Sequence, residues 1–331
     1  MADIALYPLR FEPIYQYRLW GGRRLANWLT APLPGDGPIG EAWLLSDRSD
    51  NPSRVKDGPL KGHTICDLMH EFPQLMLGKT VKSARRFPLL LKLLDVQKML
   101  SVQVHPADGT LDLIPEGETG KTEAWVVLEA APESRIYAGL KPETTTAALR
   151  SLSRWTVETH LPSFAPHRRD VIHIKAGVVH SLGDGVVVFE VQENSDVTFR
   201  LYDWDHIDPT SGKRRELQVE QALRCIDLNQ GPVTPTIPVV ETTQPSAREQ
   251  LINDPHFRMW RLHSAVPLFV GAENEPRVLF CIAGNGHIEY CEADFAVEKG
   301  DVVLLPAAVG ACRLRPERAV TLLDIAGPEQ P

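Results

Sequence analysis

Short apolar runs separated by turn residues dominate the chain from about Trp125 onward. Residues 171–174, 186–191 and 197–202 are runs of four to six residues rich in valine, isoleucine and phenylalanine. Runs of this length, bounded by glycine and polar turn residues, are typical of strands in an antiparallel sandwich or barrel. The pattern therefore predicts a mainly β fold built from many short strands.

The first hundred residues follow a different pattern, in which proline and glycine break the apolar runs. Residues 31–38 contain three prolines and two glycines, so they cannot form the interior of a regular element. Short helices are expected near residues 21–30, 64–72 and 143–155. The apolar positions expected to pack in the last of these helices are Ala147, Leu149 and Leu152.

An internal repeat joins two parts of the β-rich region. Residues 170–180 align without a gap with residues 301–311, and self-similarity of this kind indicates duplicated units. The second copy has Ala311 where the first has His180, and it has no carboxylate that corresponds to Glu123. We therefore expect two related β units, of which only the first binds a metal.

The repeat and a proline-rich connection also predict the domain organisation. Residues 1–230 are expected to form a metal-binding domain with N-terminal loops and helices. Residues 246–331 are expected to form a smaller domain that lacks metal ligands. Residues 231–245, rich in proline and β-branched residues, would link the two.

Two metal-capable side chains, Gln103 and His105, lie two residues apart in a predicted strand and therefore point to the same face. Two further segments offer partners, since Glu123 starts an apolar run and His180 follows another. Two neutral nitrogens and two oxygens suit a borderline divalent ion such as zinc. The sequence thus predicts one Zn²⁺ site per chain.

The repeated segments resemble the second motif of the cupins, which are double-stranded β-helix barrels. That motif has a Gly-Asp turn, a Pro-x-Gly corner and a metal histidine three residues later. The first copy keeps Gly177 and His180 but has Arg169 and Lys175 in place of the turn glycine and the corner proline. The second copy lacks the histidine and keeps Gly300, Asp301 and Pro306. The resemblance implies two cupin jelly rolls with a few short helices.

Seven ordered segments carry a further resemblance that extends over most of the chain, namely residues 20–22, 39–43, 87–92, 100–106, 120–128, 176–181 and 189–204. With these segments the chain resembles the short class of type I mannose-6-phosphate isomerases. The resemblance implies that the enzyme interconverts mannose 6-phosphate and fructose 6-phosphate through a cis-enediol, with the base in residues 190–200. The zinc ligands that it implies are Gln103, His105, Glu123 and His180.

Several charged residues are candidates for this chemistry. Glu190, Gln192 and Asp196 occupy evenly spaced positions in strand-like sequence. Arg200 continues the same parity, so these side chains are expected to line one face. We predict Asp196 as the acid/base with Glu190 as the alternative, and Arg200 as the cation that stabilises the enediolate or positions the substrate. The remaining candidates are Lys121 for catalysis, and Lys92 and Ser101 for substrate binding.

Two histidines modify this prediction. Short-class relatives commonly have an arginine at the position of His206, which weakens any phosphate role for that position. His173 shares the predicted strand that precedes the cupin corner, and its parity places it as a neighbour of the site without a metal role.

Composition narrows the function further. The 331 residues carry a net charge of -8 with scattered lysines and arginines, which argues against nucleic acid as a partner. No apolar run is long enough for a membrane helix, and the N-terminus lacks the apolar core of a signal peptide. Five cysteines without metal-type spacing indicate reduced thiols. We expect a cytoplasmic protein, monomeric or weakly dimeric, that acts on a small-molecule sugar phosphate.

Two other functional classes stay open. A non-catalytic sugar-binding or regulatory cupin would keep the pocket and lose the base and the metal, whereas this chain retains candidates for both. A cupin oxygenase would need a redox metal and a histidine-rich ligand set rather than one with glutamine and glutamate. An isomerase is the favoured prediction.

Overall fold

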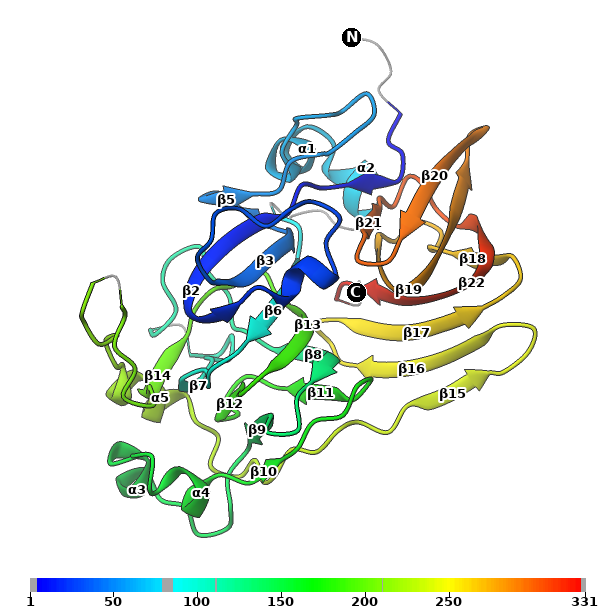
Figure 1. Ribbon diagram of the computed structural model, residues 1–331. Coiled ribbons are helices and arrows are strands. Elements are labelled where there is room, and N and C mark those ends of the chain that lie inside the picture. The colour runs from blue at the N-terminus through cyan, green and yellow to red at the C-terminus, as the bar shows by residue number, and fades with distance from the viewer. Residues whose placement is uncertain (1–4, 79–85, 111, 210, 329–331) are drawn as a thin grey trace.

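The computed structural model describes residues 5–78, 86–110, 112–209 and 211–328, and these are mainly β, as predicted (Figure 1). Two antiparallel sheets form the part of the molecule that holds the predicted metal ligands. The six-stranded sheet contains, in spatial order, β11 (Val171–Ile174), β8 (Glu123–Ala130), β13 (Val186–Glu193), β6 (Leu89–Val96), β2 (Ile14–Gly22) and β3 (Ile39–Leu45). The five-stranded sheet contains β10 (Ser163–Phe164), β9 (Arg135–Ala138), β12 (His180–Gly183), β7 (Val102–Val104) and β14 (Phe199–Tyr202).

A nine-stranded sheet is built mainly from the C-terminal part of the chain. Its main path contains β1 (Leu9–Arg10), β21 (Val302–Leu305), β19 (Arg277–Tyr290), β22 (Cys312–Ala326), β17 (Arg258–Ser264), β16 (Ala247–Asn253) and β15 (Val239–Thr242). Two strands lie off this path, β18 (Leu268–Val270) on β22 and β20 (Ala293–Glu298) on β19. A separate short pair is formed by β4 (Asp47–Arg48) and β5 (Asn51–Pro52). Two strands of this sheet lie outside residues 246–331, β1 in the predicted first domain and β15 in the predicted linker. The domain boundaries stay a prediction.

The helices are short. They are the 3₁₀ turn η1 (Arg24–Asn27) and α1 (Ile65–Glu71), α2 (Pro73–Leu77), α3 (Thr146–Arg150), α4 (Val157–His160) and α5 (Val219–Cys225). The prediction for residues 64–72 is confirmed by α1, which begins at a capping box between Thr64 and Asp67, an arrangement that satisfies amide groups at the helix start. None of the helices among the described residues has the length and apolarity to cross a bilayer.

The other two helix predictions were too long. Residues up to Gly22 still belong to β2, so only η1 lies within residues 21–30. In residues 143–155 the helix α3 ends at Arg150, because the amide of Ser153 donates to Thr156 Oγ1 in a turn that precedes α4. Side-chain bonds of this kind compete with helix continuation. Of the apolar positions expected to pack there, Leu149 is buried, Leu152 is partly buried and Ala147 is exposed.

The internal repeat is visible in two equivalent turns. The residue before the aspartate has a left-handed backbone in both, with φ of 81° at Arg169 and 90° at Gly300. The side chain of Asp170, like that of Asp301, accepts a hydrogen bond from the amide three residues earlier. A left-handed φ costs a residue with a Cβ about 1–2 kcal/mol. The first copy keeps the turn in spite of this cost at Arg169.

Strand register shows what stands in place of a metal ligand in the second copy. Glu123 pairs with Ile174 in the first copy, and Arg277 pairs with Leu305 at the matching position of the second. Arg277 Nη1 lies 3.5 Å from Asp324 Oδ1. Because a guanidinium stays protonated and has no free lone pair, Arg277 cannot act as a metal ligand at the position where the first copy has the carboxylate of Glu123.

The strand β8 is buried on both faces and thereby separates two hydrophobic clusters. Val126 belongs to the cluster shared with the nine-stranded sheet, whereas Trp125 and Val127 belong to the cluster inside the N-terminal part. Between the sheets, the rings of Phe189 and Phe280 stack with centroids 4.1 Å apart. Since alternate residues of a strand face opposite sides, Glu123 points the same way as Trp125, away from the nine-stranded sheet.

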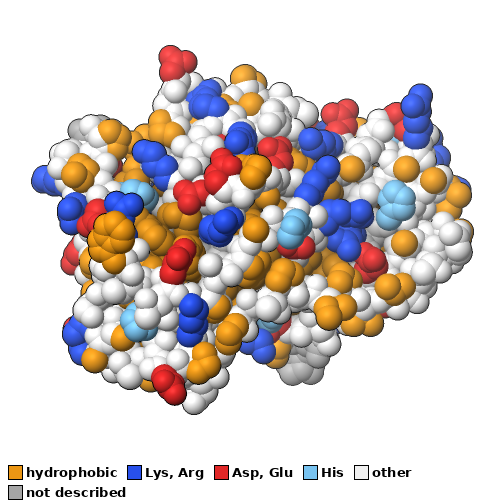
Figure 2. Space-filling model, turned by 60° about the horizontal axis from the view of Figure 1, so that its bottom comes forward, with side chains coloured by type: hydrophobic (Ala, Val, Ile, Leu, Met, Phe, Trp, Pro, Cys, Tyr) orange, Lys and Arg blue, Asp and Glu red, His pale blue; other side chains and the backbone are white. Residues whose placement is uncertain are grey.

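Charged side chains of both signs are interspersed on the face shown in Figure 2, with hydrophobic side chains between them. The most exposed large apolar side chains of the described residues are scattered along the chain, and include Trp155, Ile237 and Phe269. Scattered apolar residues are normal on a soluble surface, so these positions carry no functional argument.

The Phe189 stack predicts a large contribution to stability. Phe189→Ala is expected to lower the free energy of unfolding by about 3–5 kcal/mol, because it removes a buried ring and leaves a cavity between two sheets. Urea denaturation followed by tryptophan fluorescence would measure this. The control is Phe269→Ala, whose ring is 73% exposed and whose loss should cost less than about 0.5 kcal/mol. Equal losses in the two variants would contradict the prediction.

Candidate metal centre and active site

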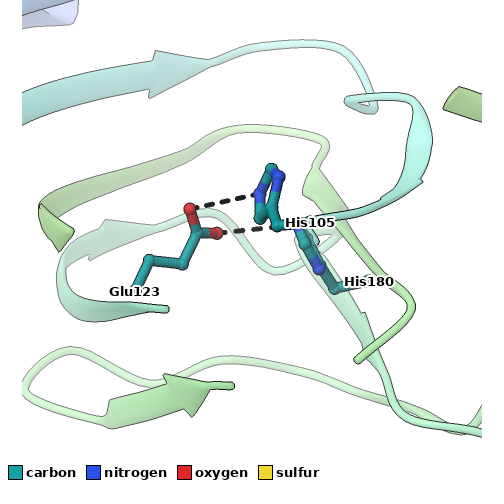
Figure 3. A group of neighbouring side chains, drawn as sticks. All are labelled: His105, Glu123 and His180. Carbon is teal, nitrogen blue, oxygen red and sulfur yellow. Dashed lines mark ion pairs between the residues drawn. The ribbon is translucent and has the colours of Figure 1, made fainter. Parts of the chain in front are cut away.

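The four predicted metal ligands converge between the five-stranded and six-stranded sheets. Gln103 of β7 is the register partner of His180 at the start of β12, and His105 directly follows β7. Glu123 begins β8 in the opposite sheet, and its carboxylate faces both imidazole rings (Figure 3). His105, Glu123 and His180 are buried, and Gln103 is partly buried.

The donor atoms of these residues lie close together. Glu123 Oε2 is 3.3 Å from His105 Nε2, and Glu123 Oε1 is 3.5 Å from His180 Nε2. The amide group of Gln103 reaches the same point, with Nε2 3.2 Å from His180 Nε2. Behind it, the Ser101 hydroxyl donates to Gln103 Oε1 at 3.0 Å. In this arrangement the amide nitrogen of Gln103 faces His180, and a half-turn of the amide would bring the oxygen to the same point.

Hydrogen bonds to the backbone fix which ring nitrogen carries the proton. His105 Nδ1 lies 2.9 Å from the carbonyl of Val197, and His180 Nδ1 lies 2.9 Å from that of Val178. A carbonyl only accepts, so each Nδ1 donates. Burial lowers the pKa of both histidines, with the charge of Lys121 as a further cause at His105, whose pKa falls to about 3. Neutral rings protonated at Nδ1 present Nε2 lone pairs.

The two Nε2 lone pairs and the Glu123 carboxylate converge on one point, where a cation would bind all three. Glu123 Oε2 is buried, and its neighbours among the described residues are His105 Nε2 and the ammonium of Lys121. Two imidazole nitrogens with Nδ1–H groups held by carbonyls, plus one carboxylate, are the donor set of a divalent metal with its supporting hydrogen bonds in place. The residues present therefore fit a metal ion.

Lys121 supplies a positive charge at the edge of this cluster. Its Nζ lies 2.8 Å from Glu123 Oε2 and 3.2 Å from His105 Nε2. Burial alone would raise the pKa of Glu123, but the charge of Lys121 holds it well below its usual range. Burial likewise opposes the charge of Lys121, yet Glu123 raises the pKa of the lysine. Both groups are therefore ionised at neutral pH.

A cavity of about 340 Å³ opens in front of the metal centre. It is lined by Arg18, Trp20, Glu41, Lys92, Leu94, Leu100, Gln103, Lys121, Glu123, Trp125, Glu190, Asp196, Thr198, Arg200 and Arg215. The structure thus brings seven predicted site residues into one cavity. Arg18, Glu41, Trp125 and Arg215 were missed. Glu41 and Trp125 lie in segments that carry the family resemblance, which could have singled them out, whereas Arg18 and Arg215 lie outside those segments.

Two carboxylates stand beside Lys92 on the cavity wall. Lys92 Nζ lies 3.5 Å from Glu190 Oε1 and 3.7 Å from Asp196 Oδ1. Burial, and then the charge of Glu123, raises the pKa of Glu190, whose Oε2 accepts a hydrogen bond of 2.9 Å from Trp125 Nε1. Burial has the same sign at Asp196, but the charges of Lys92 and Lys121 outweigh it and lower its pKa. The two carboxylates therefore differ in their affinity for a proton.

Comparison with known proteins identifies the family. A model described as the catalytic domain of type I phosphomannose isomerase matches residues 9–145. Mannose-6-phosphate isomerase ManA of Bacillus subtilis is 32% identical over 320 residues, which cover 93% of this chain and 95% of the relative. The mannose-6-phosphate isomerase of Streptococcus mutans is 30% identical over 309 residues, covering 91% and 93%.

The chain belongs to the type I phosphomannose isomerase family. The crystal structure of the mannose 6-phosphate isomerase from Bacillus subtilis matches it with a TM-score of 0.87 at 27% identity, covering 97% of this chain and 99% of that one. The resemblance drawn from the sequence is confirmed, and the chain is an isomerase with a cupin fold. Closure of each unit into a barrel stays a prediction.

Within this phosphomannose isomerase fold, the predicted single face for Glu190 to Arg200 was wrong. The strand β13 ends at Glu193, Asp196 lies in the following loop, and Arg200 belongs to β14 of the other sheet, beside Gln103. Gln192 donates through Nε2 to the carbonyl of Glu193 and is not among the residues that line the cavity. Glu190, Asp196 and Arg200 reach the same cavity from three directions, which strand parity does not encode.

The remaining candidates lie at the margins of the site. His173 faces Asp254, 3.4 Å away, rather than the cavity, so its expected place beside the site was wrong. His206 does not line the cavity. The guanidinium that lines it near this turn belongs to Arg215, which pairs with Asp203. Ser101 is buried behind Gln103, and its contact with a phosphate stays a prediction.

The converging lone pairs predict that the metal stabilises the fold. Removal of metal by a chelator is expected to lower the melting temperature, since a ligand at about 1,000 times its Kd contributes about 4 kcal/mol. In His180→Ala the larger part of this difference should disappear. Differential scanning fluorimetry with and without added Zn²⁺ would measure both. A chelator effect of the same size in the variant would contradict the assignment of these ligands.

Proposed function

We propose that the protein is a zinc-dependent aldose-ketose isomerase that interconverts mannose 6-phosphate and fructose 6-phosphate through a cis-enediol. The observation that carries the proposal is the cavity, because Glu123 of the His/Glu/His cluster lines it together with the carboxylates Glu190 and Asp196 and the lysines Lys92 and Lys121. Membership of the type I phosphomannose isomerase family supports isomerase chemistry, and relatives named mannose-6-phosphate isomerase match most of the chain. We further propose a cytoplasmic protein that is a monomer or a weak homodimer.

The ligands favour zinc over the harder divalent ions. His105 and His180 supply neutral nitrogens, and Glu123 and Gln103 supply oxygens, a mixed set that suits a borderline ion better than calcium or magnesium. A bound zinc ion would act as a Lewis acid that polarises the sugar carbonyl and the neighbouring hydroxyl. The remaining chemistry belongs to the side chains around it.

The reaction moves one proton between two carbons of the sugar. A base takes the proton from C2 of open-chain mannose 6-phosphate, a C1–C2 double bond forms, and the former carbonyl oxygen O1 takes a proton to give the cis-enediol. The base then returns a proton to C1 while O2 loses its own, which gives fructose 6-phosphate. The protein must therefore hold an ionised base near C1 and C2 and stabilise negative charge on both oxygens.

Asp196 meets the requirement for an ionised base. Its pKa lies below the usual value, so it is ready to accept a proton. Its side chain is 44% exposed in the cavity, whereas that of Glu190 is 5% exposed and accepts a hydrogen bond from Trp125. Lys92 stands between the two and stabilises the negative form of either. We therefore assign the proton transfer to Asp196, with Glu190 as the alternative.

The phosphate is best matched by the guanidinium groups on the cavity wall. Arg200 is partly buried, burial and the charge of Arg215 lower its pKa, and its Nε has no hydrogen-bond partner among the described residues. Arg18 and Arg215 line the same cavity but already hold Glu41 and Asp203. Arg200 thus gains most from a dianion or an enediolate oxygen, and Lys121 adds a second cation beside the metal ligands.

Purified, metal-replete protein is expected to convert mannose 6-phosphate to fructose 6-phosphate. Solvent deuterium should appear at C1 or C2 of the sugars, because a base exchanges its proton with water in part of the turnovers. Coupled spectrophotometry and NMR would measure the two. Sugar binding without conversion by the wild-type protein would instead support a non-catalytic cupin, and equal activity in His180→Ala would contradict the metal site.

The choice between the two carboxylates gives a further prediction. Asp196→Asn is expected to lower kcat by about 10² to 10⁴, the usual contribution of a general base, while zinc content and KM change little. The matched change Glu190→Gln should have a smaller effect on kcat. Steady-state kinetics with metal analysis of both variants would decide. A larger loss in Glu190→Gln would move the assignment to that residue.

A further inference from the structure

A second group of possible metal ligands lies outside the cavity, at the contact with the C-terminal part of the chain. It consists of Asp108, Glu193 and His256, each of which offers one ligand atom within 4.8 Å of the others. Their segments are far apart in sequence, since Asp108 follows the His105 loop, Glu193 ends β13 and His256 lies between β16 and β17.

In each of these three residues the second polar atom is already held by the protein. Asp108 Oδ1 accepts from the amide of Gly120 at 2.6 Å, and Glu193 Oε2 accepts from the amide of Thr122 at 2.6 Å. The remaining atoms, Asp108 Oδ2 and Glu193 Oε1, lie 3.7 Å and 3.8 Å from His256 Nε2. Asp108 Oδ2, Glu193 Oε1 and His256 Nε2 thus converge, while the hydrogen bonds of Asp108 Oδ1 and Glu193 Oε2 fix the direction of the two carboxylates.

The second ring nitrogen of His256, Nδ1, also has a hydrogen-bond partner in the protein. His256 Nδ1 lies 2.7 Å from Asp254 Oδ1, and the backbone amide of His256 donates to the same oxygen. A histidine that binds a metal through one nitrogen usually donates the other N–H to a carboxylate or carbonyl. The Asp254–His256 pair therefore orients Nε2 toward the two free carboxylate oxygens in the manner of a metal ligand.

The distances within the cluster suit an ion better than direct hydrogen bonds. Contacts of 3.7 Å and 3.8 Å are ion-pair distances that are too long for hydrogen bonds, so no direct hydrogen bond occupies the space between His256 Nε2 and the two carboxylate oxygens. Two tetrahedral ligands at about 2.0–2.1 Å from an ion stand about 3.4 Å apart. Small side-chain movements would therefore bring all three atoms onto one ion.

We propose that Asp108, Glu193 and His256 form a second divalent-metal site, which takes a borderline ion of the zinc type. One nitrogen and two carboxylate oxygens, with open positions for water, match that class. Access is provided by the exposed side chain of Asp108 and by a cavity of about 520 Å³ that Glu193 and His256 line. The ion would tie His256 to Gly120 and Thr122, the neighbours of Lys121 and Glu123.

The test is metal stoichiometry in protein whose first centre is disabled. Metal-free His180→Ala is titrated with Zn²⁺ by calorimetry, and Co²⁺ absorption reports the ligand set of the ion. We expect one ion per chain in His180→Ala, two in the wild type and none in the double variant His180→Ala/His256→Gln. Glu123→Gln serves as a second background should His180→Ala fold poorly, and Glu193→Gln in the wild type should reduce two ions to one.

Two further variants make the measurement specific. Asp254→Asn in the His180→Ala background is expected to weaken Zn²⁺ binding by about 10- to 100-fold, because it removes the group that orients His256. His263→Gln is the control, since His263 is an exposed histidine of the neighbouring strand that contacts Thr321 instead. In the His180→Ala background, His263→Gln should leave the affinity for Zn²⁺ equal to that of His180→Ala alone.

The proposal is overturned if His180→Ala and Glu123→Gln bind no ion, or if the double variant with His256→Gln binds as well as its parent. Neither readout depends on turnover, so the second site stands or falls separately from the proposed isomerase reaction. Binding in the absence of isomerase activity would leave this site in place and remove only the proposed function.

Discussion

The buried carboxylate of Glu123 is the constraint on which the rest of the site depends. A carboxylate removed from water is costly unless charges and hydrogen bonds compensate it, and Glu123 is 1% exposed. The ammonium of Lys121 lies beside it, and the Nε2 atoms of His105 and His180 face it. Because the histidines lie in or next to the five-stranded sheet and Glu123 begins a strand of the six-stranded sheet, the charge balance at one carboxylate joins the two sheets at the site.

The duplicated unit shows that the frame and the chemistry are separable. The same turn and the same register occur twice, and the strand positions of Glu123 and Glu190 correspond to those of Arg277 and Asp324. In the second unit these residues neutralise each other, and the guanidinium of Arg277 lies over the ring of Trp260. The frame supplies convergent side chains in both units, and residue identity decides whether they await a ligand or satisfy one another.

Sequence predicted those features that are encoded locally. Strand parity placed Gln103 and His105 together, and the repeat revealed the turn shared by Asp170 and Asp301. Features that depend on packing between distant segments could not be predicted from the sequence. Arg215 lines the cavity because the chain after Asp203 turns back and the two residues form an ion pair, and no sequence pattern predicts that return. The same holds for His256, whose partners are set by the docking of the C-terminal sheet.

Lys92 makes the two candidate bases a single electrostatic unit. It is buried and lies within 3.7 Å of both Glu190 and Asp196, so a proton on one carboxylate leaves the full charge of the lysine to the other. The two carboxylates nevertheless differ in their surroundings. Burial and the charge of Glu123 raise the pKa of Glu190, whereas at Asp196 the charges of Lys92 and Lys121 outweigh burial and lower the pKa. The same lysine therefore stands beside one carboxylate that favours the protonated form and one that favours the ionised form, which is the arrangement that a proton transfer at the cavity requires.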